Sequence, residues 1–190
     1  MRLSLLKPER SLLVAAAALL LSLASPAVHA HGPTPQKAQA SITIAAPPDV
    51  IWKLVSDFGA IGIWHPDIKA VRSTGSGDET ERVLVLEKGE ITDSLDERDD
   101  KARHLSYRLG QENVEAFPVS FYTATMTVTD AGNGSSTVDW AARLYRGDTS
   151  NFPPDELNDE AATTAMTQFF TDGLSGLKTK VEAASAPASH

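Results

Sequence analysis

Apolar residues in the first part of the chain change their spacing over a short distance. Alternation over residues 41–45 predicts a short strand, with Ile42 and Ile44 on one face. Apolar residues at steps of three and four then predict an amphipathic helix over residues 49–58. Residues 61–68 predict a second short helical turn or loop, because Pro66 interrupts them. The apolar positions of the first helix are Val50, Ile51, Leu54, Val55 and Phe58.

The middle of the chain has the period of two that is typical of strands. Short polar turns separate the alternating segments, and the clearest is the Gly- and Asn-containing turn at residues 130–135. Sequential strands with short connections predict an antiparallel meander. The predicted strands cover residues 83–86, 91–97, 103–109, 119–129 and 136–146.

The last element is predicted to be one long amphipathic helix that runs from Leu157 to Val181. Its apolar stripe includes Met166, Phe169 and Leu177 at helical spacing. A helix of roughly 27 residues would be about 40 Å long, which is enough to cross a small domain. We therefore expect an α+β fold in which a curved antiparallel sheet wraps around this helix. The space between the two either fills with side chains or becomes a pocket.

The first thirty residues have the features of an export signal. A basic start precedes an apolar run at residues 12–23, and Val28-His29-Ala30 fits the small-x-Ala cleavage rule. This predicts a cleaved Sec-type signal peptide, residues 1–30, and a periplasmic protein. Beyond it we expect a flexible leader at 31–39, one domain at 40–184 and a flexible tail at 185–190. No other apolar stretch is long enough to span a membrane.

Composition narrows the chemistry that the domain can perform. The chain of 190 residues has 17 Lys and Arg against 25 Asp and Glu, a net charge of −8, which argues against nucleic-acid binding. It has no cysteine, which excludes disulfides, thiolate metal sites and a cysteine nucleophile. Without a phosphate loop, a dinucleotide fingerprint or an H-E-x-x-H motif, we expect neither a metal nor a cofactor.

Nine residues are candidates for the lining of a pocket under the helix. If the protein is an enzyme, His65 or Asp93 would be the general acid or base. The alternative for His65 is that it orders its loop by bonding to backbone. The full set is Trp52, Trp64, His65, Asp93, Tyr107, Tyr122, Arg143, Phe169 and Gly173.

Several of these candidates have a structural alternative. Trp52 is either a pocket wall or core. Arg143 is either an anchor for a carboxylate inside the cavity or half of an exposed pair with a nearby acid. Gly173 and Gly176 cost up to about 1 kcal/mol each inside a helix relative to alanine. They either make room for a ligand or for a close approach of the sheet, or weaken the helix near its end.

The order of elements, together with several short motifs, resembles the helix-grip superfamily. The motifs are the A-x-P-x-x-V segment at 45–50 with Trp52, Asp57-Phe58, Trp64-His65-Pro66, Gly89-x-Ile91-x-Asp93-x-Leu95, Tyr107, Pro118-Val119, and Gly173-Leu174-x-x-Leu177-Lys178. This superfamily contains the START domains, the birch-pollen-allergen fold and the polyketide cyclase/dehydrase-like proteins. The resemblance covers roughly residues 39–182 and implies a cavity for a small hydrophobic ligand.

Combined with export, the pattern is most similar to the MxaD-type subset. That resemblance implies a partner protein, namely a methanol dehydrogenase that passes electrons to its cytochrome. The expected function is therefore binding of a small ligand, of a partner protein, or of both. The alternative is a cyclase- or dehydratase-like enzyme that acts on a small hydrophobic substrate in the cavity.

Overall fold

The computed structural model describes residues 32–185 and contains one seven-stranded sheet. The strand order is β1-β7-β6-β5-β4-β3-β2, and every neighbouring pair is antiparallel. The strands are β1 (Gln36–Ile44), β2 (Ala70–Thr74), β3 (Glu81–Leu86), β4 (Gly89–Asp99), β5 (His104–Gln111), β6 (Val119–Gly132) and β7 (Ser135–Arg146). The helices are α2 (Pro48–Val55), α3 (Asp159–Ser185) and three short 3₁₀ segments, η1 (Phe58–Ile63), η2 (Gly77–Glu79) and η3 (Asp155–Leu157).

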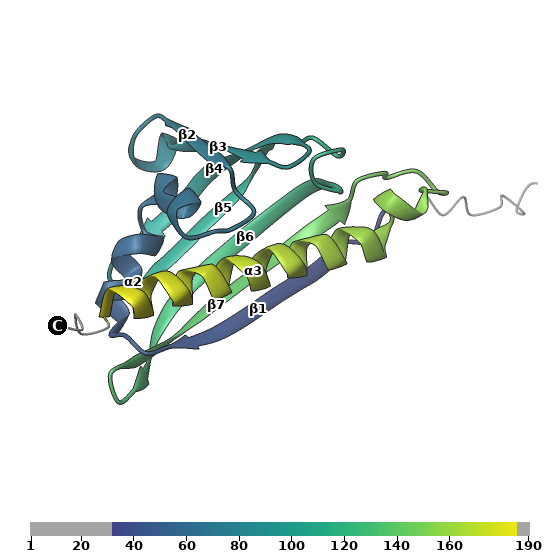
Figure 1. Cartoon of the computed structure of the whole chain (residues 1–190). Coiled ribbons are helices and arrows are strands. Elements are labelled where there is room, and N and C mark those ends of the chain that lie inside the picture. The colour runs from purple at the N-terminus through teal and green to yellow at the C-terminus, as the bar shows by residue number, and fades with distance from the viewer. Residues whose placement is uncertain (1–31, 186–190) are drawn as a thin grey trace, which may run out of the picture. The chain divides into compact units, whose positions relative to one another are not determined.

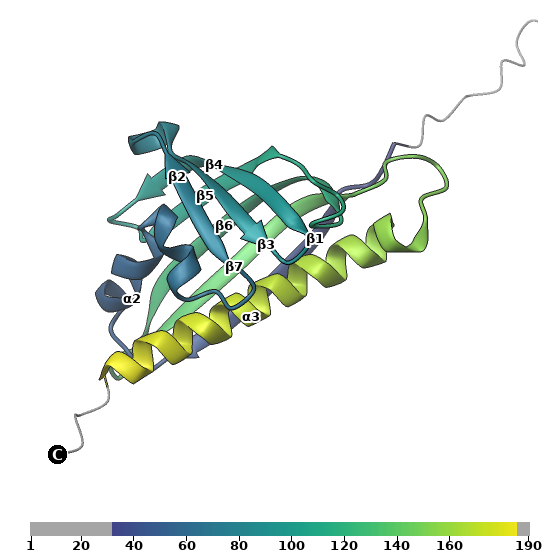
Figure 2. The same ribbon diagram turned by 45° about the horizontal axis from the view of Figure 1, so that its top comes forward.

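The long helix α3 lies along the concave face of the sheet, over β1 and β7 (Figure 1). In the turned view of Figure 2, the strands from β5 to β2 rise away from α3, and α2 and η1 fill one end of the space. The predicted architecture, a curved antiparallel sheet around a C-terminal helix with two short helices after the first strand, is confirmed.

The apolar stripe of α3 is buried against β1 and β7. Phe170 stacks on Trp140 with ring centroids 4.4 Å apart, and Phe169 meets the edge of the same indole at 5.8 Å. Met166 and Leu177 are almost completely buried. Burying apolar side chains of this size stabilises the fold by about 1.5–3 kcal/mol each.

Three predicted boundaries need correction, and one strand was missed. The strand β1 begins at Gln36, so residues 36–39 pair with β7 and do not belong to a flexible leader. The first helix ends at Val55, and the chain then tightens into η1. The short strand β2 was not predicted, because its residues are mostly exposed and show no alternation. The long helix begins at Asp159 rather than at Leu157.

Two other predictions fall mainly outside the described residues. They are the signal peptide at 1–30 and the tail at 185–190, of which only Ser185 is described, as the last residue of α3. Between residues 32 and 185, no helix has the length and apolar character that crossing a membrane requires. The same range contains no group of three or more His, Asp or Glu side chains placed to hold a metal ion.

Candidate functional site

The Trp64-His65-Pro66 loop packs directly against α3. His65 is buried, and its ring lies 3.9 Å from the ring of Phe169, centroid to centroid. Glycines in α3 permit this approach. A Cβ on Gly173 would lie 2.5 Å from His65 Cδ2, and one on Gly176 would lie 2.0 Å from the Trp64 carbonyl oxygen. The two glycines therefore make room for this loop, and not for a ligand.

Both ring nitrogens of His65 are bonded to backbone groups. Nε2 lies 2.9 Å from the Phe169 carbonyl oxygen, and Nδ1 lies 3.3 Å from the Asp67 amide nitrogen. Since a carbonyl only accepts and an amide only donates, His65 is the neutral tautomer with its proton on Nε2. Burial lowers the pKa of His65 to about 4, against the opposing effect of the Phe169 carbonyl. His65 thus orders its loop and is not a free acid or base.

This lowered pKa makes the stability of the fold depend on pH. Between about pH 6.5 and 4 the unfolded chain binds a proton on His65 that the folded protein does not bind. The stabilising effect of neutral His65 is fully present above pH 6.5 and is lost as the pH falls through 4. We expect the free energy of unfolding to fall by about 3 kcal/mol more in the wild type than in His65→Gln between pH 7 and pH 4. Urea unfolding at both pH values measures this difference; equal falls in both proteins would contradict the assignment.

A second buried cluster lies deeper, between β3, β4 and β6. Arg82 donates from Nε to Asp93 Oδ2 at 2.9 Å and from a terminal nitrogen to the Phe58 carbonyl at 3.1 Å. Tyr122 donates its hydroxyl proton to the other oxygen of Asp93. The guanidinium also lies 4.0 Å from the ring centroid of Phe58 and 4.7 Å from that of Tyr107. These contacts satisfy both buried charges, which is the condition for keeping an ion pair inside a core.

Burial is the largest cause of the shifted pKa values in this cluster. It raises the pKa of the Asp93 carboxyl, although Arg82 and Tyr122 oppose the change. It also raises the pKa of the Tyr107 and Tyr122 hydroxyls. Trp140 donates its indole N–H to the Tyr107 oxygen at 2.9 Å, which joins the cluster to the aromatic layer under α3.

The interior between the Trp64-His65-Pro66 loop and the sheet is almost completely filled. The space among Trp64, Arg82, Tyr107, Met126 and Trp140 is about 10 Å³, no more than one water molecule needs. The Trp64 indole N–H is buried beside this space and has no hydrogen-bond partner among the described residues. Trp64 and Tyr107, two of the side chains predicted to line a pocket, pack around this small space.

An open groove of about 730 Å³ lies between α3 and the surrounding loops. Five segments contribute to it: the loop after His65, the β3–β4 turn, the β5–β6 connection, η3 and the first half of α3. Its walls are mainly apolar, and Phe117 and Phe169 meet there edge to face at 5.5 Å. The apolar lining residues are Pro66, Leu86, Val114, Ala116, Phe117, Pro118, Leu157, Ala165 and Phe169.

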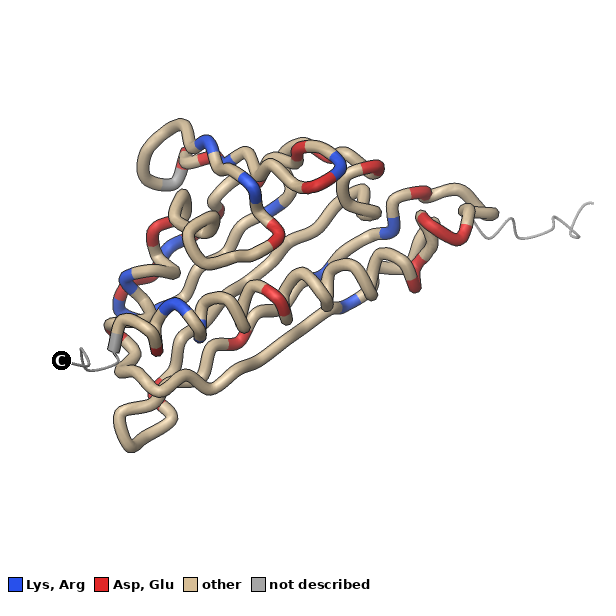
Figure 3. Tube along the Cα trace, viewed as in Figure 1, with Lys and Arg blue, Asp and Glu red and all other residues tan. Residues whose placement is uncertain are grey.

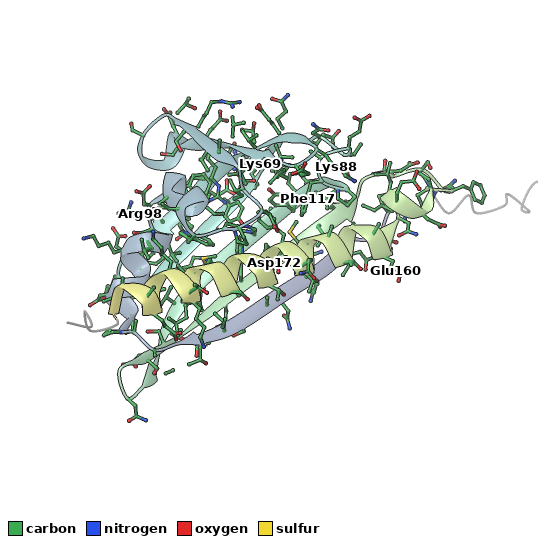
Figure 4. The ribbon with its side chains drawn as sticks, viewed as in Figure 1. Lys69, Lys88, Arg98, Phe117, Glu160 and Asp172 are labelled. Atoms are coloured by element: carbon green, nitrogen blue, oxygen red, sulfur yellow. The ribbon has the colours of Figure 1, made fainter. Side chains whose placement is uncertain are left out.

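Charged side chains surround the apolar walls of this groove. Figure 4 shows Lys69, Lys88 and Phe117 together above α3, while Arg98 lies apart, near α2. Lys69 forms an ion pair with Glu87. The other charged lining residues are Asp67, Lys88, Glu115 and Glu156. An apolar interior with a polar rim is the usual form of a site for a small organic ligand.

A second hollow of about 600 Å³ lies near η1 and the end of β4, and it is more polar. Its main charges are already paired, since Arg98 bonds to both carboxylate oxygens of Asp100. Trp52 donates its indole N–H to the same carboxylate at 3.0 Å. Trp52 therefore belongs to the core and to this cluster, and it does not line the groove.

Arg143 lies on the outer face of the sheet. It stands opposite Lys37 of β1 and Thr123 of β6, and it is exposed. The structure therefore does not support an anchor inside the cavity. The alternative expectation, an exposed pair with an acid, is not found either: within residues 32–185, no salt bridge joins Arg143 to a carboxylate.

Of the nine candidates, Phe169 lines the groove, Arg143 is exposed on the outer face of the sheet, and the other seven are buried and do not line the groove. Sequence reasoning missed Arg82 and most of the groove lining, including Phe117 and Lys88. Arg82 had a detectable signal: in the β3–β4 hairpin, Leu86 pairs with Gly89, and the same register places Arg82 opposite Asp93. The groove lining had no detectable signal in the sequence, because it comes from connections that are distant from one another along the chain.

A curved antiparallel sheet that grips one C-terminal helix defines a helix-grip protein, and comparison with known proteins agrees. XoxI of Bacillus cereus has a similar structure, with a TM-score of 0.66 and 25% identity over 80% of this chain and 99% of that one. A protein of Thermobifida fusca matches with 26% identity and a TM-score of 0.62, over 81% and 98% of the two chains. The aromatase/cyclase Zhui of Streptomyces shares only the fold, at 15% identity and a TM-score of 0.66, over 82% of this chain and 99% of that one.

The family of polyketide cyclases, dehydrases and lipid transport proteins matches residues 35–182. The chain belongs to this family. A comparison with curated proteins found no match.

Proposed function

We propose that this protein binds a small, mainly apolar ligand in the groove between α3 and the β5–β6 connection. The observation that carries the proposal is the contrast between the filled interior, about 10 Å³, and the apolar groove, about 730 Å³. The groove falls within the range of 300–1,000 Å³ that is typical of small-molecule sites. A helix-grip fold is compatible with such binding, and the family description includes lipid transport.

Filling the groove with a larger side chain should weaken binding. Ala165 lies on α3 in the groove wall, and its neighbour Thr164 is exposed outside it. We expect Ala165→Trp to weaken the binding of the neutral probe 2-(1-naphthyl)ethanol by at least about tenfold, because the indole would occupy the ligand's place. Isothermal titration calorimetry measures the dissociation constants. Thr164→Trp is the matched control and should retain the wild-type affinity. Equal affinities in all three proteins would reject the groove as the site.

The proposal also concerns where the protein acts and which partner protein it binds. The resemblance to the exported MxaD-type proteins motivates a periplasmic protein that assists the transfer of electrons from a methanol dehydrogenase to its cytochrome. The likeness to XoxI is compatible with this role but does not name a partner. A dehydrogenase–cytochrome assay with and without the purified protein tests it. An unchanged rate, together with no complex in a pull-down, would remove the partnership and leave the groove proposal standing.

The geometry favours binding over acid–base catalysis. Both nitrogens of His65 are engaged by backbone, and Asp93 is enclosed by Arg82 and Tyr122. Neither side chain lines the groove. A ligand in the groove would therefore meet neither of the two groups that sequence reasoning offered as general acid or base.

A further inference from the structure

The charged residues that line the groove are not balanced. Lys69 and Glu87 neutralise each other in an ion pair. The remaining charges are three carboxylates, on Asp67, Glu115 and Glu156, against the single ammonium of Lys88. Among residues 32–185, no salt bridge joins any of these three carboxylates to a base. A ligand in the groove therefore lies in a net negative field.

The three carboxylates come from separate segments that converge on the groove. Asp67 follows the Trp64-His65-Pro66 loop, Glu115 lies in the β5–β6 connection, and Glu156 lies in η3. They thus surround the site and do not form one acidic run on its surface. Figure 3 shows further acidic residues around η3 and the first turn of α3. Asp155 and Glu160 add to the same field, whereas Asp159 forms an ion pair with Arg146.

Asp67 also has a second carboxylate nearby. Partial burial raises the pKa of the Asp67 carboxyl, and the negative charge of Asp172, one turn beyond Gln168 on α3, raises it further. A cation that approaches Asp67 would offset the repulsion between these two carboxylates. The pair Phe117 and Phe169 supplies aromatic surface in the same groove. Cations are attracted to the faces of such rings by about 0.5–2 kcal/mol.

We propose that the groove selects ligands that join an apolar or aromatic body to a positively charged amine. This inference rests on the proposed function, because it names the chemical class that the same site takes. The apolar body contacts the walls formed by Phe117, Phe169 and Leu157. The ammonium lies toward the carboxylates of Asp67, Glu115 and Glu156. A carboxylate ligand is disfavoured, since only Lys88 would balance its charge.

Three probes of nearly equal size test the inference, namely 2-(1-naphthyl)ethylamine, 2-(1-naphthyl)ethanol and 1-naphthaleneacetate. At low ionic strength we expect the amine to bind at least about tenfold more tightly than the acid, with the alcohol between them. Added salt should reduce the difference, because it screens the charges. Calorimetry on the purified protein gives all three dissociation constants.

Charge variants test whether the preference for the amine depends on the charged residues that line the groove. In the triple variant Asp67→Asn, Glu115→Gln, Glu156→Gln, the ratio of amine to alcohol affinity should fall by about five- to tenfold. Lys88→Gln should raise that ratio, so the two variants should change the ratio of amine to alcohol affinity in opposite directions. An amine that binds no better than the alcohol, or a preference that survives the triple variant, overturns the inference alone. If neither the alcohol nor the amine binds, the proposed function fails and the inference fails with it.

Discussion

Gly176→Ala is expected to destabilise the protein by about 3 kcal/mol or more, although the same change in an exposed helix usually stabilises it by about 1 kcal/mol. The added Cβ would lie 2.0 Å from the carbonyl oxygen of Trp64 and 3.0 Å from Pro66 Cδ. The obstacle is backbone in a proline-containing loop, so no side-chain rotation can relieve the contact. Either the loop must move away from α3 or the helix must bend.

Urea unfolding of the purified variants measures this effect. Gly173→Ala should also destabilise, because its Cβ would meet the rings of His65 and Trp140 at 2.5 and 2.8 Å. Ser175→Ala lies between the two glycines on the exposed side of α3 and serves as the control, with an expected change within about 0.5 kcal/mol. A Gly176→Ala protein as stable as Ser175→Ala would show that α3 does not lie against the loop as described.

Arg82→Met is expected to cost about 3–5 kcal/mol, because it leaves the buried Asp93 carboxylate without its partner. Asp93 is 1% exposed and has Tyr122 as its other side-chain partner. Replacing both members by Arg82→Met and Asp93→Leu removes both charges, and the double variant should be more stable than Arg82→Met alone. The difference between these two proteins isolates the cost of an unpaired charge from the loss of packing.

An exposed pair on the same sheet is the matched control. Arg72 of β2 bonds to Glu90 of β4, and the two side chains are 57% and 47% exposed. Arg72→Met should cost less than about 1 kcal/mol, since exposed ion pairs contribute little. If Arg82→Met and Arg72→Met destabilise equally, the buried cluster does not stabilise the fold in the way that its contacts indicate.

The parts of the fold that follow from local periodicity were predictable from the sequence. The stripe from Met166 to Leu177 indicated the long helix. The alternation in residues 136–146 placed Val138, Trp140, Ala142 and Leu144 on one face, and all four are buried. The anomaly of two glycines in this helix was also visible, but periodicity cannot say what they face. The loop that occupies their place is more than one hundred residues away in the sequence.

Side-chain direction was the main uncertainty for the site. In β3, residues 83–86 are all apolar, so alternation alone did not identify the buried face, and Arg82 was overlooked. The buried set is Arg82, Leu84 and Leu86. The sequence indicates Asp93 as a candidate acid or base, but in the structure it is the ion-pair partner of Arg82, which lies opposite it. The groove depends on five separate segments, and no local pattern relates Glu156 to Lys88 or Glu115.

Methyl NMR tests directly whether the ligand lies in the groove and not inside the fold. The Ala165 methyl lies in the groove, and the Met126 methyl lies at the filled interior space. With alanine and methionine methyls labelled and 2-(1-naphthyl)ethanol bound, we expect nuclear Overhauser effects from the naphthalene protons to Ala165 and none to Met126. Effects to Met126 without effects to Ala165 would place the ligand in the interior and contradict the account.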